Sequence, residues 1–393
     1  MKVVQLNAVC GVGSTGGITV EISKMLTAHN IENYILYTNR RHDYELGIRY
    51  SNDMLVKSNA ALAAIFGNYG FNSYISTRRL IRLLNDIKPD IVHLHNIHGH
   101  DLNLSIFFEY LKRKNVRVIW TFHDCWAFTG YCMHFDSLSC QKWQSECRSC
   151  PQAKKYSVFF DRSKELYLKK KRLFTAIDDM TVVSPSVWLA ALAKRSFLNK
   201  YPIEVINNGI DLDIFMPRES DIRERYGLEN KKIVLGVPKG KLKYFVELSR
   251  IMAEKYKLVL VGLNDKEIQS IPGNILGLPR TRDRIEMAEL FSAADVYINT
   301  TLEDTFPTVN LEAQACGTPV ITFNTGGSQE AIDDNTGAVV EKGNIQAMYE
   351  AVQYICGGPD RSAACIERAR RLYDAKERFN DYYDLYCRAG RFK

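Results

Sequence analysis

The pattern of hydrophobic and polar residues changes period along the chain. Short β-branched runs predict strands over residues 3–9, 34–38, 91–95, 116–122, 180–184 and 203–206, and helical spacing follows the first of them over 18–29. The series starts again with strands over 232–237, 256–261, 274–278, 296–299 and 319–323, with helices over 243–255 and 284–293. Such alternation is typical of βαβ units in a parallel sheet. We therefore expect two doubly wound α/β domains, joined in the Pro- and Asn-containing stretch 202–217, and one long terminal helix over 346–387.

Composition and charge narrow the class of protein. The 393 residues are 46% hydrophobic and 25% charged, as in ordinary globular proteins. The net charge of +7 is uneven, because residues 1–205 hold 27 Lys and Arg against 17 Asp and Glu, and the rest hold 25 against 28. The first half is therefore expected to meet an anionic partner. Basic residues interleave with apolar ones at Arg78, Arg79 and Arg82 and over 169–172, a pattern that indicates either an amphipathic helix on anionic lipid or a solvated helix face.

No nucleic-acid motif accompanies this charge, so nucleic acid is not an expected partner. The first residues predict a strand and not a signal peptide, and the longest uncharged run, 58–77, is too polar to cross a membrane. We expect a cytoplasmic protein that lies peripherally on the inner face of the cell membrane.

A glycine-rich turn follows the first strand. Residues 11–17 read Gly-Val-Gly-Ser-Thr-Gly-Gly, which satisfies the dinucleotide pattern Gly-x-Gly-x-x-Gly. A nicotinamide site also needs an acidic residue at the end of the second strand, but that strand ends Tyr37-Thr38-Asn39-Arg40-Arg41. An oxidoreductase therefore stays only as a weak alternative. The remaining interpretations are a turn whose backbone approaches a ligand closely, or a tight turn needed for packing.

The most informative segment is 301–320, TLEDTFPTVNLEAQACGTPV. Pro307 suits the first turn of a helix, where the N–H groups of Thr308 and Val309 would face a phosphate. Asp304 precedes this helix, and Glu312 lies about two turns from Asp304. Both carboxylates could therefore face one cleft and accept hydrogen bonds, one from sugar hydroxyls and the other from a ribose. A capped surface helix with solvated acids is the alternative.

These motifs resemble those of the retaining glycosyltransferases of family 4, which have the GT-B fold. The segment 301–320 is similar to the family's Glu-x7-Glu signature, and VINNGIDLDIFMP (205–217) to its interdomain segment. Further similarities are VVSPSVWLA (182–190), PDIVHLHNIHGH (89–100), WTFHD (120–124) and Gly16-Gly17. The sequence HDCWAFTG (123–130) brings the chain nearest to the bacterial polysaccharide branch.

The resemblance implies two Rossmann-like domains facing across a cleft, an acceptor domain over 1–205 and a nucleotide-sugar domain over 206–370. A C-terminal helix over 371–393 would pack back toward the first domain. The implied activity is transfer of a hexose-type sugar from a nucleoside diphosphate to a lipid-linked saccharide in capsule, exopolysaccharide or O-antigen (lipopolysaccharide) synthesis. The diphosphate would leave with the help of charge, without a cofactor.

Site residues follow from the same resemblance. The implied catalytic residues are His123 at a strand end, Asp304 or Glu303, and Lys239 or Lys241. The implied donor-binding residues are Gly16, Gly17, Leu278, Arg280, Phe306, Thr308, Val309 and Glu312.

Two departures from the family pattern keep an alternative open. An aspartate, Asp304, stands at the first position of Glu-x7-Glu, and the arginine that usually precedes the Lys-Gly pair is missing from the shortened loop 238–243. A non-catalytic sugar-binding or assembly subunit on the same fold is therefore the alternative.

Five of the ten cysteines fall between Cys125 and Cys150, in a loop that we expect to be too poor in apolar residues to fold alone. Four thiolates can form a closed tetrahedral zinc site. A structural zinc ion on Cys132, Cys140, Cys147 and Cys150 is one interpretation. Because only Cys147 and Cys150 have the short Cys-x2-Cys spacing, free thiols and disulfides remain alternatives. The histidines at 93, 95, 98 and 100 are a weaker metal candidate, because strand alternation places only His93 and His95 on one face.

Overall fold

The computed structural model describes residues 1–40, 42–238 and 242–390. The chain divides into two compact units. The first contains Met1–Asn207 and Phe379–Lys393, and the second contains Asn208–Arg378. Both are α/β units, and the GT-B fold class expected from the sequence is confirmed. The boundary after Asn207 falls inside the stretch 202–217.

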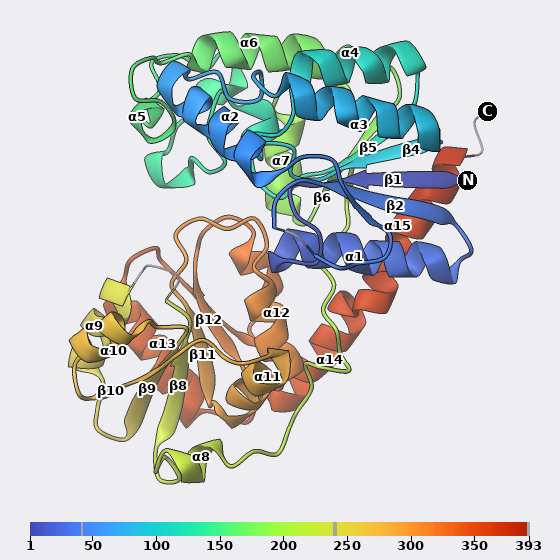
Figure 1. The fold of residues 1–393 in the computed structure, drawn as a ribbon. Coiled ribbons are helices and arrows are strands. Elements are labelled where there is room, and N and C mark those ends of the chain that lie inside the picture. The colour runs from blue at the N-terminus through green and yellow to red at the C-terminus, as the bar shows by residue number, and fades with distance from the viewer. Residues whose placement is uncertain (41, 239–241, 391–393) are drawn as a thin grey trace. The chain divides into compact units, whose positions relative to one another are not determined.

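The first unit is built on a seven-stranded parallel sheet with the order β3-β2-β1-β4-β5-β6-β7 (Figure 1). Central strand β1 is nearly continuous in apolar residues because helices cover both of its faces. The strands of the first unit are β1 (Lys2–Leu6), β2 (Glu32–Tyr37), β3 (Gly47–Arg49), β4 (Ile91–Leu94), β5 (Arg117–Thr121), β6 (Met180–Ser184) and β7 (Ile203–Val205). Its α-helices before the boundary are α1 (Gly13–Ala28), α2 (Asp53–Phe66), α3 (Tyr74–Ile87), α4 (Leu104–Lys114), α5 (Ala153–Tyr156), α6 (Ser163–Phe174) and α7 (Val187–Lys194).

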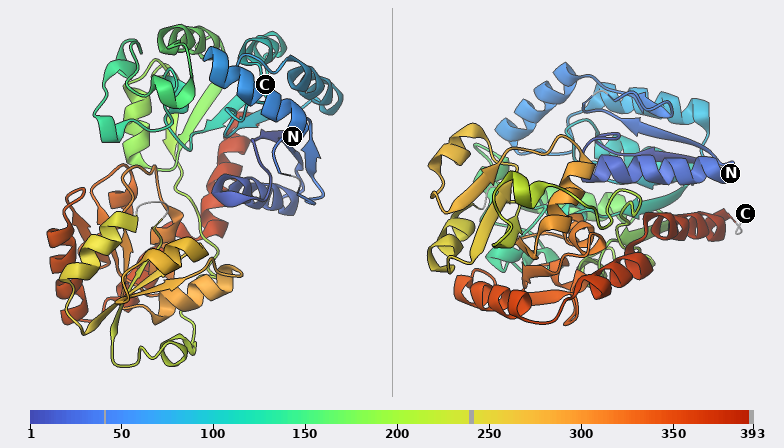
Figure 2. Two further views of the ribbon diagram at one scale, coloured as in Figure 1. Left: turned by 60° about the vertical axis from the view of Figure 1, so that its left-hand side comes forward. Right: turned by 90° about the horizontal axis from the view of Figure 1, so that it is seen from below.

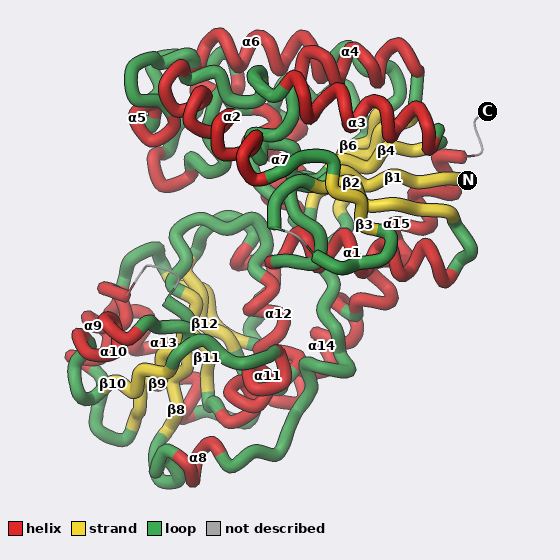
Figure 3. Tube along the Cα trace, viewed as in Figure 1, coloured by secondary structure: helices red, strands yellow, loops and turns green. Residues whose placement is uncertain are grey.

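The segment between β5 and α6 has little regular structure. Figure 3 shows it as loop with short helical turns, which are η1 (Trp126–Phe128), η2 (Asp136–Leu138), η3 (Lys142–Gln144) and α5. It is nevertheless well packed, because large aromatic side chains are buried along it: Trp126, Phe128, Tyr131, Phe135, Trp143 and Tyr156. The expectation of an apolar-poor loop was wrong.

The last helix, α15 (Ala375–Gly390), completes the first unit from the far end of the chain. It lies beside α1 on one face of the sheet, as the views in Figures 1 and 2 agree. Tyr383 of α15 stacks on His29 at the end of α1, with ring centroids 3.8 Å apart. Tyr382 and Tyr386 are buried against the sheet. The C-terminal helix thus packs on the N-terminal unit, as expected.

The second unit has a six-stranded parallel sheet with the order β10-β9-β8-β11-β12-β13. Alternate residues of its strands enter two separate cores: Val259 of β9 packs in the core that contains α11, α12 and α14, and Leu260 in the core that contains α9 and α13. The strands are β8 (Lys232–Gly236), β9 (Tyr256–Val261), β10 (Ile275–Leu278), β11 (Val296–Asn299), β12 (Val320–Phe323) and β13 (Gly337–Val340). The helices are α8 (Ile222–Arg225), α9 (Leu242–Ile251), α10 (Asp265–Ser270), α11 (Arg284–Ala293), α12 (Thr308–Ala315), η4 (Ser328–Ala331), α13 (Ile345–Gly357) and α14 (Ser362–Tyr373).

The structure differs from the predicted elements in three places. The long terminal helix is three helices, α13, α14 and α15, because Gly358 and Pro359 interrupt it and Asp374 leaves the helical conformation. Helix α1 begins at Gly13, five residues before its predicted start, so the glycines lie in its first turns. Strands β3 and β13 were not predicted.

Candidate active site

The candidate site residues follow the carboxyl ends of parallel strands, where open α/β sheets bind their ligands. In the second unit they follow β10 and β11, and the segment after β12 supports them. In the first unit they follow β1, β4 and β5. A cavity of about 710 Å³ in the second unit lies elsewhere, since Lys232, Asp295 and Pro319, at the starts of strands, line it. We do not assign that cavity to the donor.

Helix α12 begins without a side-chain cap. Pro307 occupies the N-cap position with φ −70° and ψ 115°, immediately before the first turn in which the sequence predicted it. N–H groups in the first turn of a helix lack intrahelical acceptors, and the helix dipole adds partial positive charge. Thr308 and Val309 are half-buried at this end. The helix end can therefore receive an anionic group such as a diphosphate.

Carboxylates flank this helix end. Oδ1 of Asp304 accepts a hydrogen bond from the backbone N–H of Phe306 at 3.1 Å, which turns the chain toward α12. Glu303 precedes it, and Glu312 lies one turn into the helix, with both side chains half-buried. Burial, then the charges of Glu312 and Asp304, raise the pKa of Tyr297 on β11. The carboxylates of Glu312 and Asp304 therefore both lie close enough to Tyr297 for their charges to affect its hydroxyl.

A buried polar network holds the ends of β11 and α12 together, and sequence reasoning missed it. Nδ2 of Asn299 donates to Oδ1 of Asn310 at 2.9 Å. Nδ2 of Asn310 donates to the hydroxyl of Ser328 at 3.1 Å, and that hydroxyl contacts the hydroxyl of Thr322 at 2.7 Å. Because these groups are buried, each lost partner would leave an unsatisfied polar atom. The network fixes the segment that carries Glu303 and Asp304.

The turn after β12 packs on the same segment. The N–H of Gly327 donates to the carbonyl oxygen of Asp304 at 3.1 Å. Gly326 has φ +52°, and a Cβ there would lie 2.0 Å from that oxygen, so only glycine fits.

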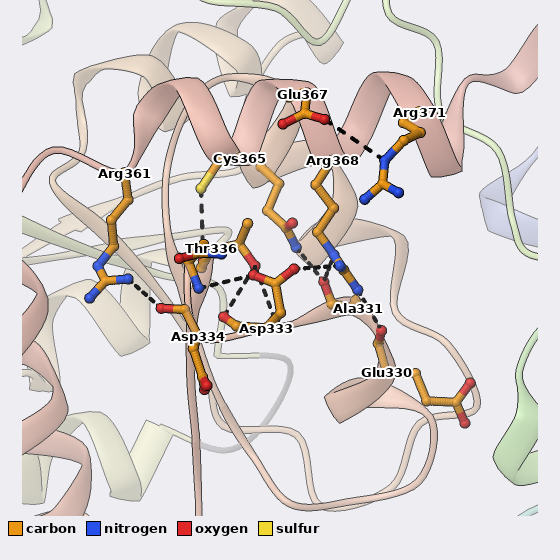
Figure 4. Close-up of polar contacts among 12 residues, drawn as sticks. Glu330, Ala331, Asp333, Asp334, Thr336, Arg361, Cys365, Glu367, Arg368 and Arg371 are labelled. Carbon is orange, nitrogen blue, oxygen red and sulfur yellow. Dashed lines mark hydrogen bonds and ion pairs between the residues drawn. The ribbon is translucent and has the colours of Figure 1, made fainter.

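Arg368 of α14 supports the end of this turn (Figure 4). Its guanidinium donates to the carbonyl oxygens of Ala331 and Glu330 at 3.1 and 3.2 Å and to Oδ2 of Asp333 at 2.5 Å. Neither Gly326 nor Arg368 was singled out from the sequence, although the Gly-Gly pair after a strand was a readable signal of close backbone approach.

The other predicted site residues of the second unit differ in burial. Leu278 ends β10 and is buried, and its carbonyl oxygen accepts hydrogen bonds from the N–H groups of Gly262 and Leu263 at 3.1 Å each. Arg280, two residues further, is exposed. Lys239 and Lys241 lie outside the described residues.

In the first unit, the glycine turn leads directly into α1. The N–H of Gly11 donates to the carbonyl oxygen of Gly16 at 3.0 Å, which closes the turn. A Cβ on Gly16 would meet the nitrogen of Gly11 at 3.1 Å, whereas no described atom lies within 4 Å of a Cβ built on Gly17. Gly16 is therefore a packing residue, and Gly17 borders open space that a ligand can use.

A chain of hydrogen bonds assigns the tautomer of His123. Nε2 of Gln5 donates to the carbonyl of Thr19 at 2.9 Å, so Oε1 of Gln5 accepts from Nε2 of His95 at 3.2 Å. In a neutral ring, Nδ1 of His95 then carries the lone pair and accepts from Nε2 of His123 at 3.1 Å. Nδ1 of His123 is consequently the acceptor nitrogen of its ring.

Burial keeps these rings neutral. It lowers the pKa of His123 to about 4 and that of His93 to about 3, and it holds the pKa of His95 well below the usual value. His93 of β4 and His95, the first residue after this strand, lie on the same side, as strand alternation predicted, with ring centroids 4.1 Å apart. His93 bonds to Tyr386 at 2.6 Å and to Thr121 at 2.8 Å. Among the described residues, no group of three or more His, Cys, Asp or Glu is arranged to hold a metal ion.

Comparison with known proteins identifies the family. Residues 18–214 match the model described as Glycosyltransferase Family 4, and residues 235–357 match one described as Glycosyl transferases group 1. The chain belongs to glycosyltransferase family 4. This family 4 glycosyltransferase is thus an enzyme, a transferase, which sets aside both the oxidoreductase and the non-catalytic alternatives.

Relatives align over nearly the whole of this family 4 glycosyltransferase. It is 23% identical to the putative colanic acid biosynthesis glycosyl transferase WcaC of Escherichia coli K12, over 98% of this chain and 99% of the relative. Sucrose-phosphate synthase from Thermosynechococcus elongatus has the same fold, with a TM-score of 0.71, 18% identity and 98% coverage of both chains. Anabaena HepE in complex with UDP and glucose has a TM-score of 0.68 at 14% identity, over 98% of this chain and 99% of that one.

The basic clusters of the glycosyltransferase are only partly at the surface. Arg78, Arg79 and Arg82 are exposed on α3. In the run 169–172, however, Lys170 is completely buried, with Nζ 2.7 Å from the carbonyl oxygen of Trp126 and 3.7 Å from the centroid of its indole ring. The predicted lipid-facing run was wrong at this residue, because α6 turns it into the core. The described residues include no helix long and apolar enough to cross a membrane.

Proposed function

We propose that this enzyme transfers a hexose-type sugar from a nucleoside-diphosphate sugar to a lipid-linked saccharide, with retained anomeric configuration, in the synthesis of a bacterial surface polysaccharide. The observation that carries the proposal is the uncapped N-terminus of α12 with the carboxylates of Asp304 and Glu312 beside it. The printed name of WcaC, which refers to colanic acid biosynthesis, supports the polysaccharide. The complex of HepE with UDP and glucose supports the donor class.

The donor would bind through complementary groups of the second unit. The N–H groups at the start of α12, near Thr308 and Val309, would receive the diphosphate, and Lys239 or Lys241 would add a positive charge. Glu312 would accept hydrogen bonds from the ribose. These cationic and N–H groups can stabilise the leaving diphosphate without a divalent metal.

Asp304 or Glu303 would accept hydrogen bonds from the hydroxyls of the transferred sugar. The bond of Asp304 to the N–H of Phe306 orients its carboxylate, which favours Asp304 as a precisely aimed acceptor.

The acceptor hydroxyl would attack the anomeric carbon on the face from which the diphosphate departs. The C–O bond to the acceptor forms as the bond to phosphate breaks, and a phosphate oxygen takes the acceptor proton. His123 is neutral, so its proposed role is a hydrogen bond to a sugar hydroxyl through Nδ1 and not the donation of a full charge. Gly17 would leave room for the ligands to approach.

The test is donor binding and turnover with a panel of nucleotide sugars. The purified enzyme should be stabilised thermally by one nucleotide sugar and should hydrolyse or transfer it, and NMR of the first-formed product should show the donor's anomeric configuration. Glu312→Gln should weaken donor binding, whereas Glu254→Gln, at a side chain that is 98% exposed, should not. Absence of binding at millimolar donor, or an inverted product, would refute the proposal.

A pair of variants separates the two sugar-contact candidates. Asp304→Asn keeps an oxygen for the N–H of Phe306 and removes the charge, and Glu303→Gln is the matched change one residue earlier. If Asp304 contacts the sugar, the first variant should lose kcat by about 10²-fold or more and the second should not. The reverse pattern would assign the role to Glu303.

We also propose that the first unit docks on anionic lipid at the cytoplasmic face of the membrane. Apolar side chains are exposed at the end of α2 and in the loop after α5, including Phe66 and Phe159, which is 69% exposed. The two segments are joined, because the N–H of Val158 donates to the carbonyl oxygen of Ala64 at 2.7 Å. The exposed arginines of α3 supply charge that is complementary to anionic headgroups.

Vesicle flotation tests this docking. The enzyme should float with vesicles that contain phosphatidylglycerol and not with pure phosphatidylcholine, and Phe159→Ser should reduce the bound fraction. Tyr354→Ser, at a side chain of the second unit that is 66% exposed, is the matched control. Equal behaviour of the two vesicle types, or of the two variants, would refute lipid docking.

A further inference from the structure

Four cysteines spread over 19 residues of the loop between β5 and α6 come together at one small cavity. Its volume is about 20 Å³, enough for one water-sized body, and its lining includes Cys132, Cys140, Cys147 and Cys150. All four thiols are half-buried and none forms a disulfide. The sequence named the same four cysteines as candidate zinc ligands, although only Cys147 and Cys150 have a short spacing, and the fold brings all four to one cavity.

One pair already has the spacing of ligands to a shared metal. The sulfurs of Cys132 and Cys150 lie 3.9 Å apart. Zinc–sulfur bonds of about 2.3 Å in a tetrahedron place two sulfurs about 3.8 Å apart, whereas a disulfide needs about 2.05 Å. No three of these groups are yet arranged around one point, so closure on an ion requires some of the thiols to rotate.

Backbone N–H groups are aimed at the sulfurs. Gly130 donates to Sγ of Cys147 at 3.3 Å, and the N–H of Gln152 bonds to Cys150. Such hydrogen bonds favour thiolate ligands and orient them. Nζ of Lys142 also donates to the carbonyl oxygens of Arg148 and Ser149, at 3.1 and 2.8 Å, and so ties the turn between Cys147 and Cys150 to the segment after Cys140.

A buried lysine lies near the cluster. Lys170 is completely buried, and burial lowers its pKa to about 7, against the opposing effect of negative charge on Cys147, Asp124 and Cys132. Asp124 already pairs with His98 at 2.9 Å. A zinc ion with four thiolates carries a net charge of −2, so its binding would favour the charged form of this lysine.

We propose that Cys132, Cys140, Cys147 and Cys150 bind one structural zinc ion. Four sulfur ligands close the coordination sphere, so the ion would hold no water for catalysis. It would fasten the segment that directly follows His123 and Asp124, since the hydroxyl of Thr129 donates to the carbonyl oxygen of Cys132 at 2.7 Å and the N–H of Cys125 donates to that of Met133 at 2.8 Å. The small cavity favours a single ion over an iron–sulfur cluster.

Elemental analysis of the full-length enzyme tests the proposal independently of its activity. Protein purified from zinc-supplemented cells without chelators should contain about one zinc per chain and no iron. Cys147→Ser and Cys150→Ser should each lose the metal, and Cys356→Ser, at a half-buried thiol of the second unit, should keep it. Well under one zinc per chain, an iron content near the protein content, or zinc retained in both cluster variants would overturn the proposal.

A second measurement uses the unaltered chain, in case the serine variants fail to fold. A chelator should accelerate alkylation of the four cluster thiols and leave Cys356 unchanged, as peptide mass spectrometry would show. Cobalt added to reduced, metal-free enzyme should produce the thiolate charge-transfer band of a tetrahedral site. Equal alkylation with and without chelator, no cobalt band, or an intact disulfide between Cys132 and Cys150 would show that the cysteines serve another purpose.

Discussion

The contact of Gly326 with Asp304 leads to a sharp prediction for Gly326→Ala. The new Cβ would lie 2.0 Å from the carbonyl oxygen of Asp304, and real contacts are not shorter than 3.0 Å, so the two segments must separate by about 1 Å. The φ of +52° adds about 1–2 kcal/mol of strain for alanine, and overpacking adds about 1–3 kcal/mol. The second unit should therefore lose about 2–5 kcal/mol of stability. A misplacement of about 1 Å can cost 10²-fold in rate, so if Asp304 contacts the transferred sugar as proposed, kcat/KM should fall by about that factor.

Two other glycines separate displacement of the site from loss of stability. A Cβ on Gly337 would lie 1.9 Å from the carbonyl oxygen of Val320, a similar clash, but at the amino ends of β12 and β13. Gly337→Ala should lower the melting temperature while the folded fraction keeps near-normal kcat/KM. Gly273→Ala, with no described atom within 4 Å, should change neither quantity. If Gly326→Ala keeps wild-type kcat/KM, or if Gly337→Ala loses as much, the positioning of Asp304 by Gly326 is refuted.

Three further variants test other parts of the structure. Gln5→Leu removes the oxygen that accepts the hydrogen bond of His95 and so fixes its tautomer. We expect kcat to fall with the KM for the donor unchanged, and nitrogen NMR of the imidazoles to show mixed tautomers. A single, unaltered tautomer would contradict the assignment. Between pH 6.5 and about 4, the unfolded chain binds protons at the buried rings that the folded chain does not, so the free energy of unfolding should fall as pH falls, by about 1.4 kcal/mol per pH unit for each ring. The free energy of unfolding, measured by urea titration at several pH values, should fall less steeply with pH in His93→Gln than in the wild type. An unchanged pH dependence would mean that His93 does not contribute. Arg368→Met removes three hydrogen bonds from the turn after β12 and should cost about 1–3 kcal/mol, measured by thermal unfolding against Arg371→Met, whose side chain is 65% exposed. Equal stability of the two arginine variants would leave no supporting role for Arg368.

The sequence predicted the strands that local pattern defines. The runs 180–184, 256–261 and 296–299 were right to the residue, because buried parallel strands are continuous apolar stretches between helices. Strand β13 was missed because Gly337 and Ala338 at its start do not form a β-branched run. The break between α14 and α15 was missed because Asp374 carries no strong stop signal.

Long-range contacts explain what the sequence could not predict about the site. The burial of Lys170 depends on the indole of Trp126, 44 positions away, and nothing in the run 169–172 distinguishes this lysine from its neighbours. The Asn299–Asn310–Ser328–Thr322 network joins four segments, namely β11, α12, η4 and β12, and no local pattern in any one of them shows that its polar side chain meets the others. The glycine turn was predicted as a feature, but only the structure separates the packing role of Gly16 from the open surface at Gly17.

The place of α15 in the first unit has a consequence for how the enzyme is made on the ribosome. Tyr382 and Tyr386 cover His93 and Thr121 from the last residues of the chain, and all of residues 208–378 must be synthesised in between. At about 5–20 residues per second, the nascent first unit waits roughly 9–34 s with that face of its sheet uncovered. During this interval the second unit can already fold, so the first unit is completed only after the second has been synthesised.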